Sequence, residues 1–222
     1  MNTDVVAVQL NGINKSFGKT RALIEIDLRL AAAHRHALVG PNGSGKTTLL
    51  RLLAGLLPPE SGTARCLGFD LRVDSRALKS LVAYVTQHFS MYEELTLQQN
   101  LQFNADLHAI PSESFAMDQV FDVFDLAANR NKRAGSVSMG VRQRLMLAAA
   151  LTRHPKILLL DEPTAALDEQ SRIMLWSRID ACQATGTTII LTTHNPSDVE
   201  RCDTVTDLAG GRIAAHRSVN HP

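Results

Sequence analysis

Residues 40 to 47 read Gly40-Pro41-Asn42-Gly43-Ser44-Gly45-Lys46-Thr47, and they fit the pattern G-x-x-x-x-G-K-[ST] at every fixed position. A triphosphate needs many hydrogen-bond donors at close range, and Gly43 and Gly45 let backbone N–H groups approach it closely. Lys46 adds a mobile cation for the outer phosphates, and the hydroxyl of Thr47 suits Mg²⁺. The stretch therefore predicts a loop that binds a nucleotide through its phosphates.

The residues on either side of this loop support the same interpretation. Ala37, Leu38 and Val39 predict a buried strand before it, and residues 47–54 predict a helix whose N-terminus faces the phosphates. A chance glycine-rich turn is the competing interpretation, and the match at all the specified features argues against it. The residues expected to bind the nucleotide here are Gly40, Pro41, Asn42, Gly43, Ser44, Gly45, Lys46, Thr47 and Thr48.

Length and composition limit the remaining possibilities. The chain has 222 residues, of which 45% are hydrophobic, and this is enough for one large α/β domain with a substantial core. Its formal net charge of +1 and the lack of a dense basic block give no case for nucleic-acid binding. No apolar stretch approaches the roughly 18 residues of a membrane span, and Met1–Asp4 lacks the basic start of a secretory signal. These features predict a cytosolic protein.

The cysteines and histidines show no spacing typical of a metal site. Cys66, Cys182 and Cys202 are far apart in the sequence, and we expect them to be free, buried thiols. His34 and His36 alternate along a predicted strand, and we expect this pair to be exposed on one face of it.

Hydrophobic periodicity predicts an α/β core interrupted by a helical segment. Strands are expected at residues 5–10, 22–30, 37–39, 63–67, 82–85, 157–160, 187–192, 205–208 and 211–213, with Ile24, Ile26, Leu28 and Leu30 pointing inward. Helices are expected at residues 47–54, after a capping box at Thr96, from Phe115 to Phe124, and at residues 141–152 and 169–184. The predicted organisation is one domain, 1–222, with an α/β core from residues 1–88 and 154–222 and an inserted helical lobe at 89–153.

Two acids follow the apolar run Ile157–Leu160, which is typical of a parallel strand covered on both faces. Open α/β sheets bind ligands beside the carboxyl ends of such strands. Asp161 can hold Mg²⁺ through water, and Glu162 can polarise an attacking water molecule. Alone, this pair could equally be an ordinary strand-to-loop turn, but the phosphate-binding loop upstream favours the functional interpretation.

His194 and Gln87 also follow β-rich runs. His194 could contact the terminal phosphate and hold the attacking water, and its alternative is a histidine at a helix N-terminus or in the core. Gln87 could bind Mg²⁺ and respond to the terminal phosphate, and its alternative is a solvated loop glutamine.

Together these features resemble the nucleotide-binding subunit of ATP-binding-cassette (ABC) transporters. The family's motifs occur in order over nearly the whole chain: Walker A at Gly40–Thr47, a Q-loop at Gln87, a signature near Ser138, Walker B ending at Asp161-Glu162, a D-loop at residues 165–168 and an H-loop at His194. The resemblance implies a P-loop NTPase fold with a mixed or parallel core sheet, an N-terminal antiparallel β part and an inserted helical lobe.

The same resemblance implies roles for individual residues, with ATP and Mg²⁺ as the ligands. Phe17 matches the aromatic residue that stacks on adenine. The residues implied to bind the nucleotide beyond the loop are Phe17, Gln87, Ser138, Gly140 and Asp168. The implied Mg²⁺ ligands are Thr47, Gln87 and Asp161, and the implied catalytic residues are Glu162, His194 and Lys46.

The signature departs from the family's common form L-S-G-G-Q, because this chain has Val137-Ser138-Met139-Gly140-Val141. Ser138 and Gly140 are kept, and both lie where a helix begins, so that its dipole favours an anion. Met139 and Val141 allow either a weakened site or a branch variant. The run Gly140–Leu145 resembles the G-M-R-Q-R-L form of drug and antibiotic exporters, which favours the variant.

The family resemblance implies an ATPase subunit that drives an exporter through a separate membrane permease. Two copies would close head to tail around two ATP molecules, and the subunit would lie at the inner face of the cell membrane through its permease. The segment Phe89–Thr96, with Tyr92, Glu93 and Glu94, is expected to receive a cytoplasmic helix of that permease. The alternatives are a soluble ABC ATPase with a mechanical or regulatory role, a P-loop kinase, and import instead of export.

Overall fold

The structure, a computed structural model, describes residues 5–111, 116–165 and 167–219. The strands are β1 Val6–Phe17, β2 Thr20–Ala31, β3 Arg35–Val39, β4 Ser61–Cys66, β5 Phe69–Asp70, β6 Val82–Val85, β7 Ile157–Asp161, β8 Thr188–Thr192, β9 Thr204–Ala209 and β10 Arg212–Ser218. The helices are α1 Lys46–Leu53, α2 Ser75–Leu81, α3 Leu97–Leu107, α4 Met117–Val123, α5 Met139–Leu151, α6 Glu169–Ala184 and α7 Pro196–Val199, with 3₁₀ turns at Ala127–Asn129 and Ala134–Ser136.

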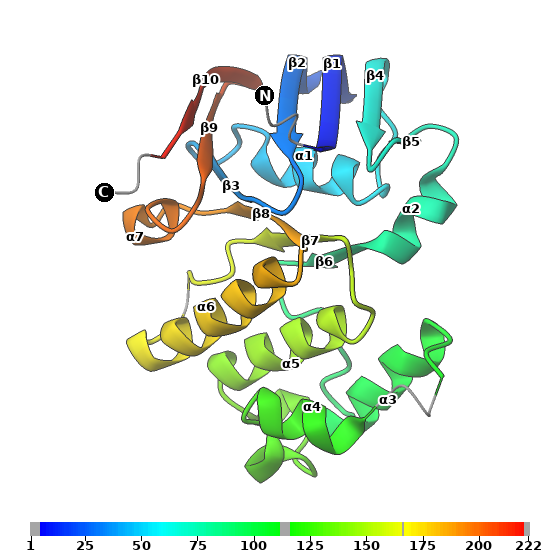
Figure 1. Ribbon diagram of the computed structural model, residues 1–222, viewed down its shortest axis with the longest axis vertical. Coiled ribbons are helices and arrows are strands. Elements are labelled where there is room, and N and C mark those ends of the chain that lie inside the picture. The colour runs from blue at the N-terminus through cyan, green and yellow to red at the C-terminus, as the bar shows by residue number, and fades with distance from the viewer. Residues whose placement is uncertain (1–4, 112–115, 166, 220–222) are drawn as a thin grey trace.

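The strands form two sheets, as the family resemblance implies. A four-stranded antiparallel sheet has the order β2-β1-β4-β5, and a six-stranded sheet has the order β10-β9-β3-β8-β7-β6. The five strands from β9 to β6 run parallel, and β10 is antiparallel to β9. Figure 1 shows the antiparallel sheet at one end of an elongated molecule and helices α3, α4 and α5 at the other. The predicted fold class is therefore confirmed.

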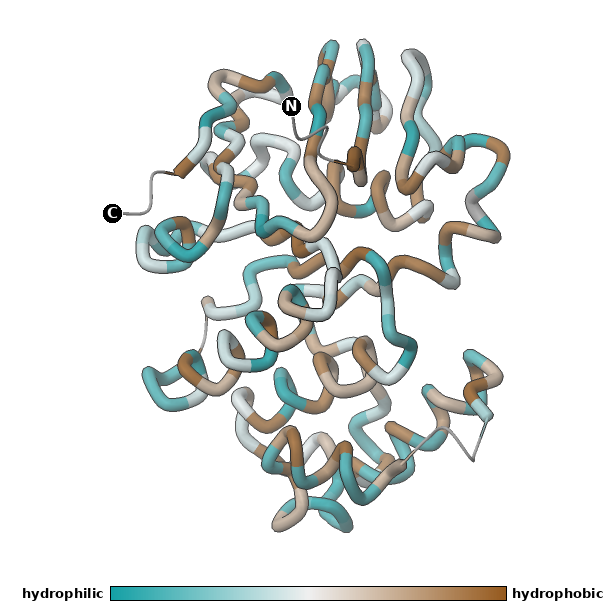
Figure 2. The backbone as a smooth tube through the Cα atoms, in the orientation of Figure 1, coloured by the Kyte–Doolittle hydropathy of each residue, from teal (hydrophilic) through white to brown (hydrophobic). Residues whose placement is uncertain are grey.

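Alternation along the central strands divides the core into two clusters. In β7, Leu158 and Leu160 join a cluster with α5 and α6, whereas Ile157 and Leu159 join a cluster with α1 and the antiparallel sheet. Because successive side chains of a strand point to opposite faces, one apolar run serves both clusters. Figure 2 shows hydrophobic stretches through the centre of the molecule, where these strands lie.

Helices occupy most of the described chain between β6 and β7. Apart from an isolated bridge between Thr96 and Arg133, these described residues form no strand pairing. The predicted capping box is confirmed, because the Thr96 hydroxyl accepts from the Gln99 N–H at 3.1 Å and the Gln99 carboxamide accepts from the Thr96 N–H at 2.9 Å. The division of the chain at residues 89 and 153 stays a prediction, and Phe115 lies outside the described residues.

Several local expectations are wrong for identifiable reasons. Ile24 is only half-buried and Leu23 points inward instead, because Glu25 has a left-handed backbone with φ 49° and shifts the alternation of β2. Cys182 is partly exposed, whereas Cys66 and Cys202 are buried free thiols as expected. The strands β1 and β2 are longer than expected, and the short helices α2 and α7 were not predicted from the sequence.

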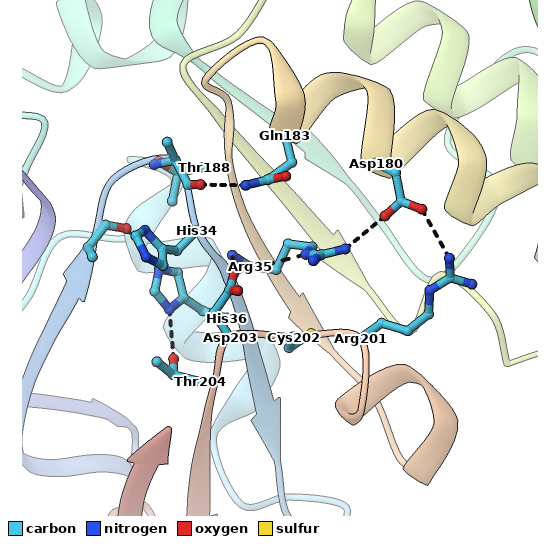
Figure 3. Close-up of polar contacts among 12 residues, drawn as sticks. His34, Arg35, His36, Asp180, Gln183, Thr188, Arg201, Cys202, Asp203 and Thr204 are labelled. Atoms are coloured by element: carbon cyan, nitrogen blue, oxygen red, sulfur yellow. Dashed lines mark hydrogen bonds and ion pairs between the residues drawn. The ribbon is translucent and has the colours of Figure 1, made fainter. Parts of the chain in front are cut away.

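His36 is the clearest correction, because it is 1% exposed instead of lying on a solvent face. Its Nε2 donates to the backbone oxygen of Ala31 at 2.8 Å, and its Nδ1 accepts from the hydroxyl of Thr204 at 2.7 Å (Figure 3). Both ring nitrogens therefore have partners in the neutral form. Burial lowers the pKa of His36 to about 4.

Candidate nucleotide-binding site

The predicted phosphate-binding loop connects β3 to α1, and neighbouring backbone leaves no room for a side chain at one of its glycines. Gly45, the N-cap of α1, has φ 108°, and a Cβ there would lie 2.6 Å from the backbone oxygen of Ala22 in β2. Gly43 has φ 77° with open space around it, so it leaves room for a phosphate. The loop closes on itself through a 3.1 Å bond from the Ser44 N–H to the Pro41 oxygen.

A cavity of about 310 Å³ lies over this loop. It is lined by Thr20, Ala22, Asn42, Gly43, Ser44, Gly45, Lys46, Thr47, Thr48, Gln87 and Glu162. The fold thus brings most of the predicted loop residues together with two residues that lie far away in the sequence, Gln87 and Glu162. Polar groups dominate this lining, which suits a phosphate chain better than an apolar ligand.

Lys46 is 7% exposed and bonds to its own loop. Its Nζ donates to the backbone oxygens of Gly40 at 2.8 Å and Pro41 at 3.2 Å, and lies 3.3 Å from Nε2 of His194. Burial lowers the pKa of Lys46, and the nearby carboxylates of Glu162 and Asp161 oppose that shift. The ammonium group is therefore held at the cavity without a direct carboxylate partner in the described structure.

Asp161, at the end of β7, accepts hydrogen bonds from three different elements. Its donors are the hydroxyls of Thr47 at 3.2 Å, Thr192 at 2.7 Å and Tyr84 at 3.0 Å. Burial and the nearby carboxylate raise the pKa of Tyr84 to about 12, so the phenol stays a donor. The Thr47 and Asp161 oxygens are hard ligands that face each other at the start of α1, and this donor set fits Mg²⁺.

Glu162 and His194 are in direct contact. Oε1 of Glu162 lies 2.9 Å from Nε2 of His194, and the Glu162 N–H donates to the hydroxyl of Thr192 at 2.8 Å. Glu162 has φ 51°, a left-handed conformation that is uncommon for a residue with a side chain. Tyr84 and Thr192 organise this part of the site, and sequence reasoning missed both because hydroxyls on buried strands carry no motif.

The other predicted ligands lie elsewhere. Phe17 is 47% exposed at the end of β1, with Nζ of Lys15 at 5.8 Å from its ring centroid. Ser138 is the exposed N-cap of α5, and Asp168 is the N-cap of α6, where it accepts from the Ser171 N–H at 2.8 Å. That bond lowers the pKa of Asp168. None of these residues lines the cavity among the described residues, and position 166 of the expected D-loop lies outside them.

The fold and the site define a P-loop nucleoside triphosphatase whose Walker A and Walker B residues meet at one cavity. The sequence profile of the ABC transporter family matches residues 23–165, and the chain belongs to this family. It is therefore an ATPase of the ABC class. Within the described ranges, no helix has the length and apolar character needed to cross a membrane.

Curated relatives cover nearly the whole chain. Daunorubicin resistance ATP-binding protein DrrA3 of Streptomyces coeruleorubidus is 35% identical over 94% of this chain and 67% of its own length. The probable multidrug ABC transporter ATP-binding protein YbhF of Escherichia coli is 38% identical over 96% of this chain and 37% of its own length. Nod factor export ATP-binding protein I of Rhizobium sp. (strain N33) is 33% identical over 96% of this chain and 71% of its own length.

Solved structures share the fold. The protein cbiO1 from Clostridium perfringens, part of the ABC transporter complex cbiONQ, matches with a TM-score of 0.85 at 25% identity, covering 97% of this chain and 89% of that chain. A dimeric ATP-binding cassette in a post-hydrolysis state with ADP and Pi matches with a TM-score of 0.87 at 21% identity, covering 96% of this chain and 99% of that chain.

Proposed function

We propose that this chain is the ATP-hydrolysing subunit of an exporter whose membrane pathway belongs to a separate permease. The observation that carries the proposal is the cluster of Lys46, Glu162 and His194 over the phosphate-binding loop, with contacts of 3.3 Å and 2.9 Å. The relatives named for daunorubicin resistance, multidrug transport and Nod factor export support the direction of transport.

Each residue of the cluster has a role in the proposed hydrolysis. Lys46 would exchange its bonds to the loop oxygens for the outer phosphates of ATP, because a phosphate is the stronger acceptor. Glu162 would orient or deprotonate the attacking water, and His194 would hold that water beside the terminal phosphate. The side chains proposed to hold Mg²⁺ are Thr47, Gln87 and Asp161. When bound, this ion would neutralise charge on the phosphates.

The signature residues are proposed to act on the nucleotide of a second copy. Ser138 and Gly140 lie at the start of α5, where N–H groups and the helix dipole favour an anion. Contacts with the terminal phosphate would favour a closed dimer with ATP and not with ADP, so ATP shifts the equilibrium toward closure. Asp168 would contribute from the neighbouring D-loop, and Phe17 would stack on adenine of its own protomer.

The permease is proposed to bind a groove between α3, α5 and β6. A cavity of about 270 Å³ lies there, and its lining includes Tyr92, Phe103, Leu107 and Arg153. Tyr92 and Phe103 are 54% and 43% exposed, and their rings meet edge to face at 5.0 Å. An amphipathic helix fits such a groove, because its apolar face would cover these rings. The chain would then lie on the inner face of the cell membrane through its permease.

Substitution of Glu162 by Gln tests the proposal. The Glu162→Gln protein is expected to bind ATP, to lose turnover and to accumulate as a dimer with ATP, because the amide cannot accept the proton. ATPase assays and light scattering with ATP or ADP measure these outcomes. Full turnover by this variant would remove Glu162 from its proposed role, and a monomer with ATP would contradict the proposed closure.

A further inference from the structure

Asp198, on α7, is a carboxylate that is 0% exposed and takes no part in the proposed site. Its Oδ2 accepts from the hydroxyls of Thr164 at 2.5 Å and Thr193 at 2.8 Å, and its Oδ1 accepts from the indole N–H of Trp176 at 3.0 Å. All three donors are neutral groups. Since an ionised carboxylate is an acceptor only, these donors match the charged form of Asp198.

The two hydroxyls belong to the turns that carry the proposed catalytic residues. Thr164 follows Glu162 by two positions, and Thr193 directly precedes His194. The Thr193 hydroxyl also accepts from the N–H of Asn195 at 3.0 Å, so the backbone is fixed on both sides of His194. One oxygen atom of Asp198 therefore connects the two turns whose Glu162 and His194 side chains are in contact.

The other oxygen of Asp198 is bonded to a side chain in the core of the domain, the indole of Trp176. Trp176, on α6, is 1% exposed, and the guanidinium of Arg201 lies 4.8 Å from its ring centroid. Arg201 and Arg35 both donate to Asp180 on α6, at 3.0 Å and 2.8 Å (Figure 3). The bond from Arg35 connects α6 to β3. Asp198 thus links the two turns that carry Glu162 and His194 to α6 and the central sheet.

We propose that Asp198 is a positioning residue for ATP hydrolysis, which sets the separation of the Glu162 and His194 turns. This rests on the catalytic roles proposed above for those two residues. Burying a carboxylate with only neutral partners costs folding free energy, and apolar side chains of similar volume often stabilise a fold equally well. Stability alone therefore does not account for the arrangement. What the carboxylate adds is a fixed distance between the turns, and a misplacement of about 1 Å can cost a large part of the rate.

Thr164→Val and Thr193→Val test this proposal, because each removes one donor to Oδ2 and nearly keeps the side-chain shape. Each variant is expected to lower kcat about tenfold, with KM for ATP within about twofold of the wild type. The double variant is expected to lose clearly less than the product of the two single losses, since both act through one oxygen. Thr164→Ser keeps a hydroxyl and is expected to restore kcat.

Thr187→Val is the matched control, because Thr187 is also buried and its hydroxyl donates to the Pro155 oxygen at 3.0 Å, away from both turns. It is expected to lower Tm as much as Thr164→Val and to leave kcat unchanged. If the Thr164 and Thr193 variants keep kcat while Tm falls as in this control, Asp198 is only structural and the proposal is wrong. A raised KM at unchanged kcat would overturn it too. Failure of the proposed function is distinct, since the wild type itself would then not hydrolyse ATP.

Discussion

Glu162 combines a left-handed backbone, with φ 51°, and a carboxylate 2.9 Å from a histidine nitrogen. A residue with a side chain adopts that conformation only when the surroundings hold it there, at a cost on the order of 1–3 kcal/mol. Here the Thr192 hydroxyl accepts from the Glu162 N–H and donates to Asp161. One threonine on the neighbouring strand therefore holds both the carboxylate of Asp161 and the backbone of Glu162.

Lys46→Ala is the first prediction at the residue scale. The variant is expected to lose nucleotide affinity by about tenfold or more, because the ammonium is the cation of the loop and its bond to a phosphate contributes about 1.5–3 kcal/mol. Equilibrium binding of ATP measures the effect. Lys79→Ala, at an exposed position on α2, is the control and should bind like the wild type. Unchanged binding by Lys46→Ala would mean that the loop has been misinterpreted.

His36 gives a prediction for the pH dependence of stability. An unfolded histidine has a pKa of about 6.5, and burial lowers the pKa of folded His36 to about 4. Because the fold favours the neutral ring, this contribution to stability is complete above pH 6.5 and is lost as the pH falls toward 4, by up to about 3 kcal/mol. Denaturant unfolding between pH 7 and 4 measures the loss.

The control for this prediction is His36→Gln, whose amide can donate and accept but does not titrate. It should be less stable than the wild type at pH 7 and should lose less stability between pH 6.5 and 4. An equal loss in both proteins would assign the acid sensitivity to other groups.

At the scale of elements, the sequence predicted those features that depend on local pattern. The strand, loop and helix at residues 37–54 are specified by glycines at fixed positions, and α6 is found over the whole of its predicted range, Glu169–Ala184. What could not be predicted depends on contacts between elements. The left-handed Glu25 that shifts β2, and the burial of His36 between Ala31 and Thr204, follow from partners that lie in other strands.

The site shows the same limit. Asp161, Glu162 and His194 were predicted from their positions after apolar runs, although their roles stay proposals. Tyr84 and Thr192 were not predicted, because a hydroxyl on a buried strand is common and becomes part of the site only when neighbouring strands are in register. Pairing of Asp161 with Thr192 across β7 and β8 supplies that register.

Gly140 allows a prediction about the start of α5. A Cβ at this position would lie 2.6 Å from Oγ of Ser171 on α6, so Gly140→Ala is expected to lower Tm slightly and to abolish ATP-dependent dimerisation. The glycine thus has two separate roles, which are close packing of α5 against α6 and the proposed contact with the partner's ATP. Adding Ser171→Ala removes the clash and should restore Tm without restoring the dimer, because under the proposed function the terminal phosphate of the partner's ATP must also approach this backbone closely.

Differential scanning calorimetry and light scattering with ATP, both in the Glu162→Gln background, measure these two effects. Recovery of the dimer in the double variant would show that Gly140 is needed only for packing against α6. ATP affinity of the monomer is expected to be unchanged throughout, since Gly140 does not line the cavity of its own protomer among the described residues.

At the scale of the whole molecule, the nucleotide cavity and the groove lined by Tyr92, Phe103 and Leu107 are separate features of the surface. Arg142, four positions after Ser138, donates to Glu93 at 3.1 Å and to the Gly135 oxygen at 2.6 Å. Its guanidinium also lies 5.2 Å from the centroid of the Phe89 ring. A helix seated in the groove would contact Tyr92, which lies between Phe89 and Glu93 in the sequence, and these two residues hold Arg142 on the helix that begins at the signature.

Leu107→Asp tests whether this groove binds a permease. Leu107 is 66% exposed at the end of α3, so the substitution is expected to leave folding and ATP affinity unchanged. It should lower co-purification with a multi-span membrane protein about tenfold or more, because a charge would face the apolar side of the incoming helix. Val73→Asp, at a residue 81% exposed and outside the groove, is the matched control and should co-purify like the wild type. Equal recovery with both variants would move the contact elsewhere, and recovery of the wild type without any membrane protein would favour a role apart from transport.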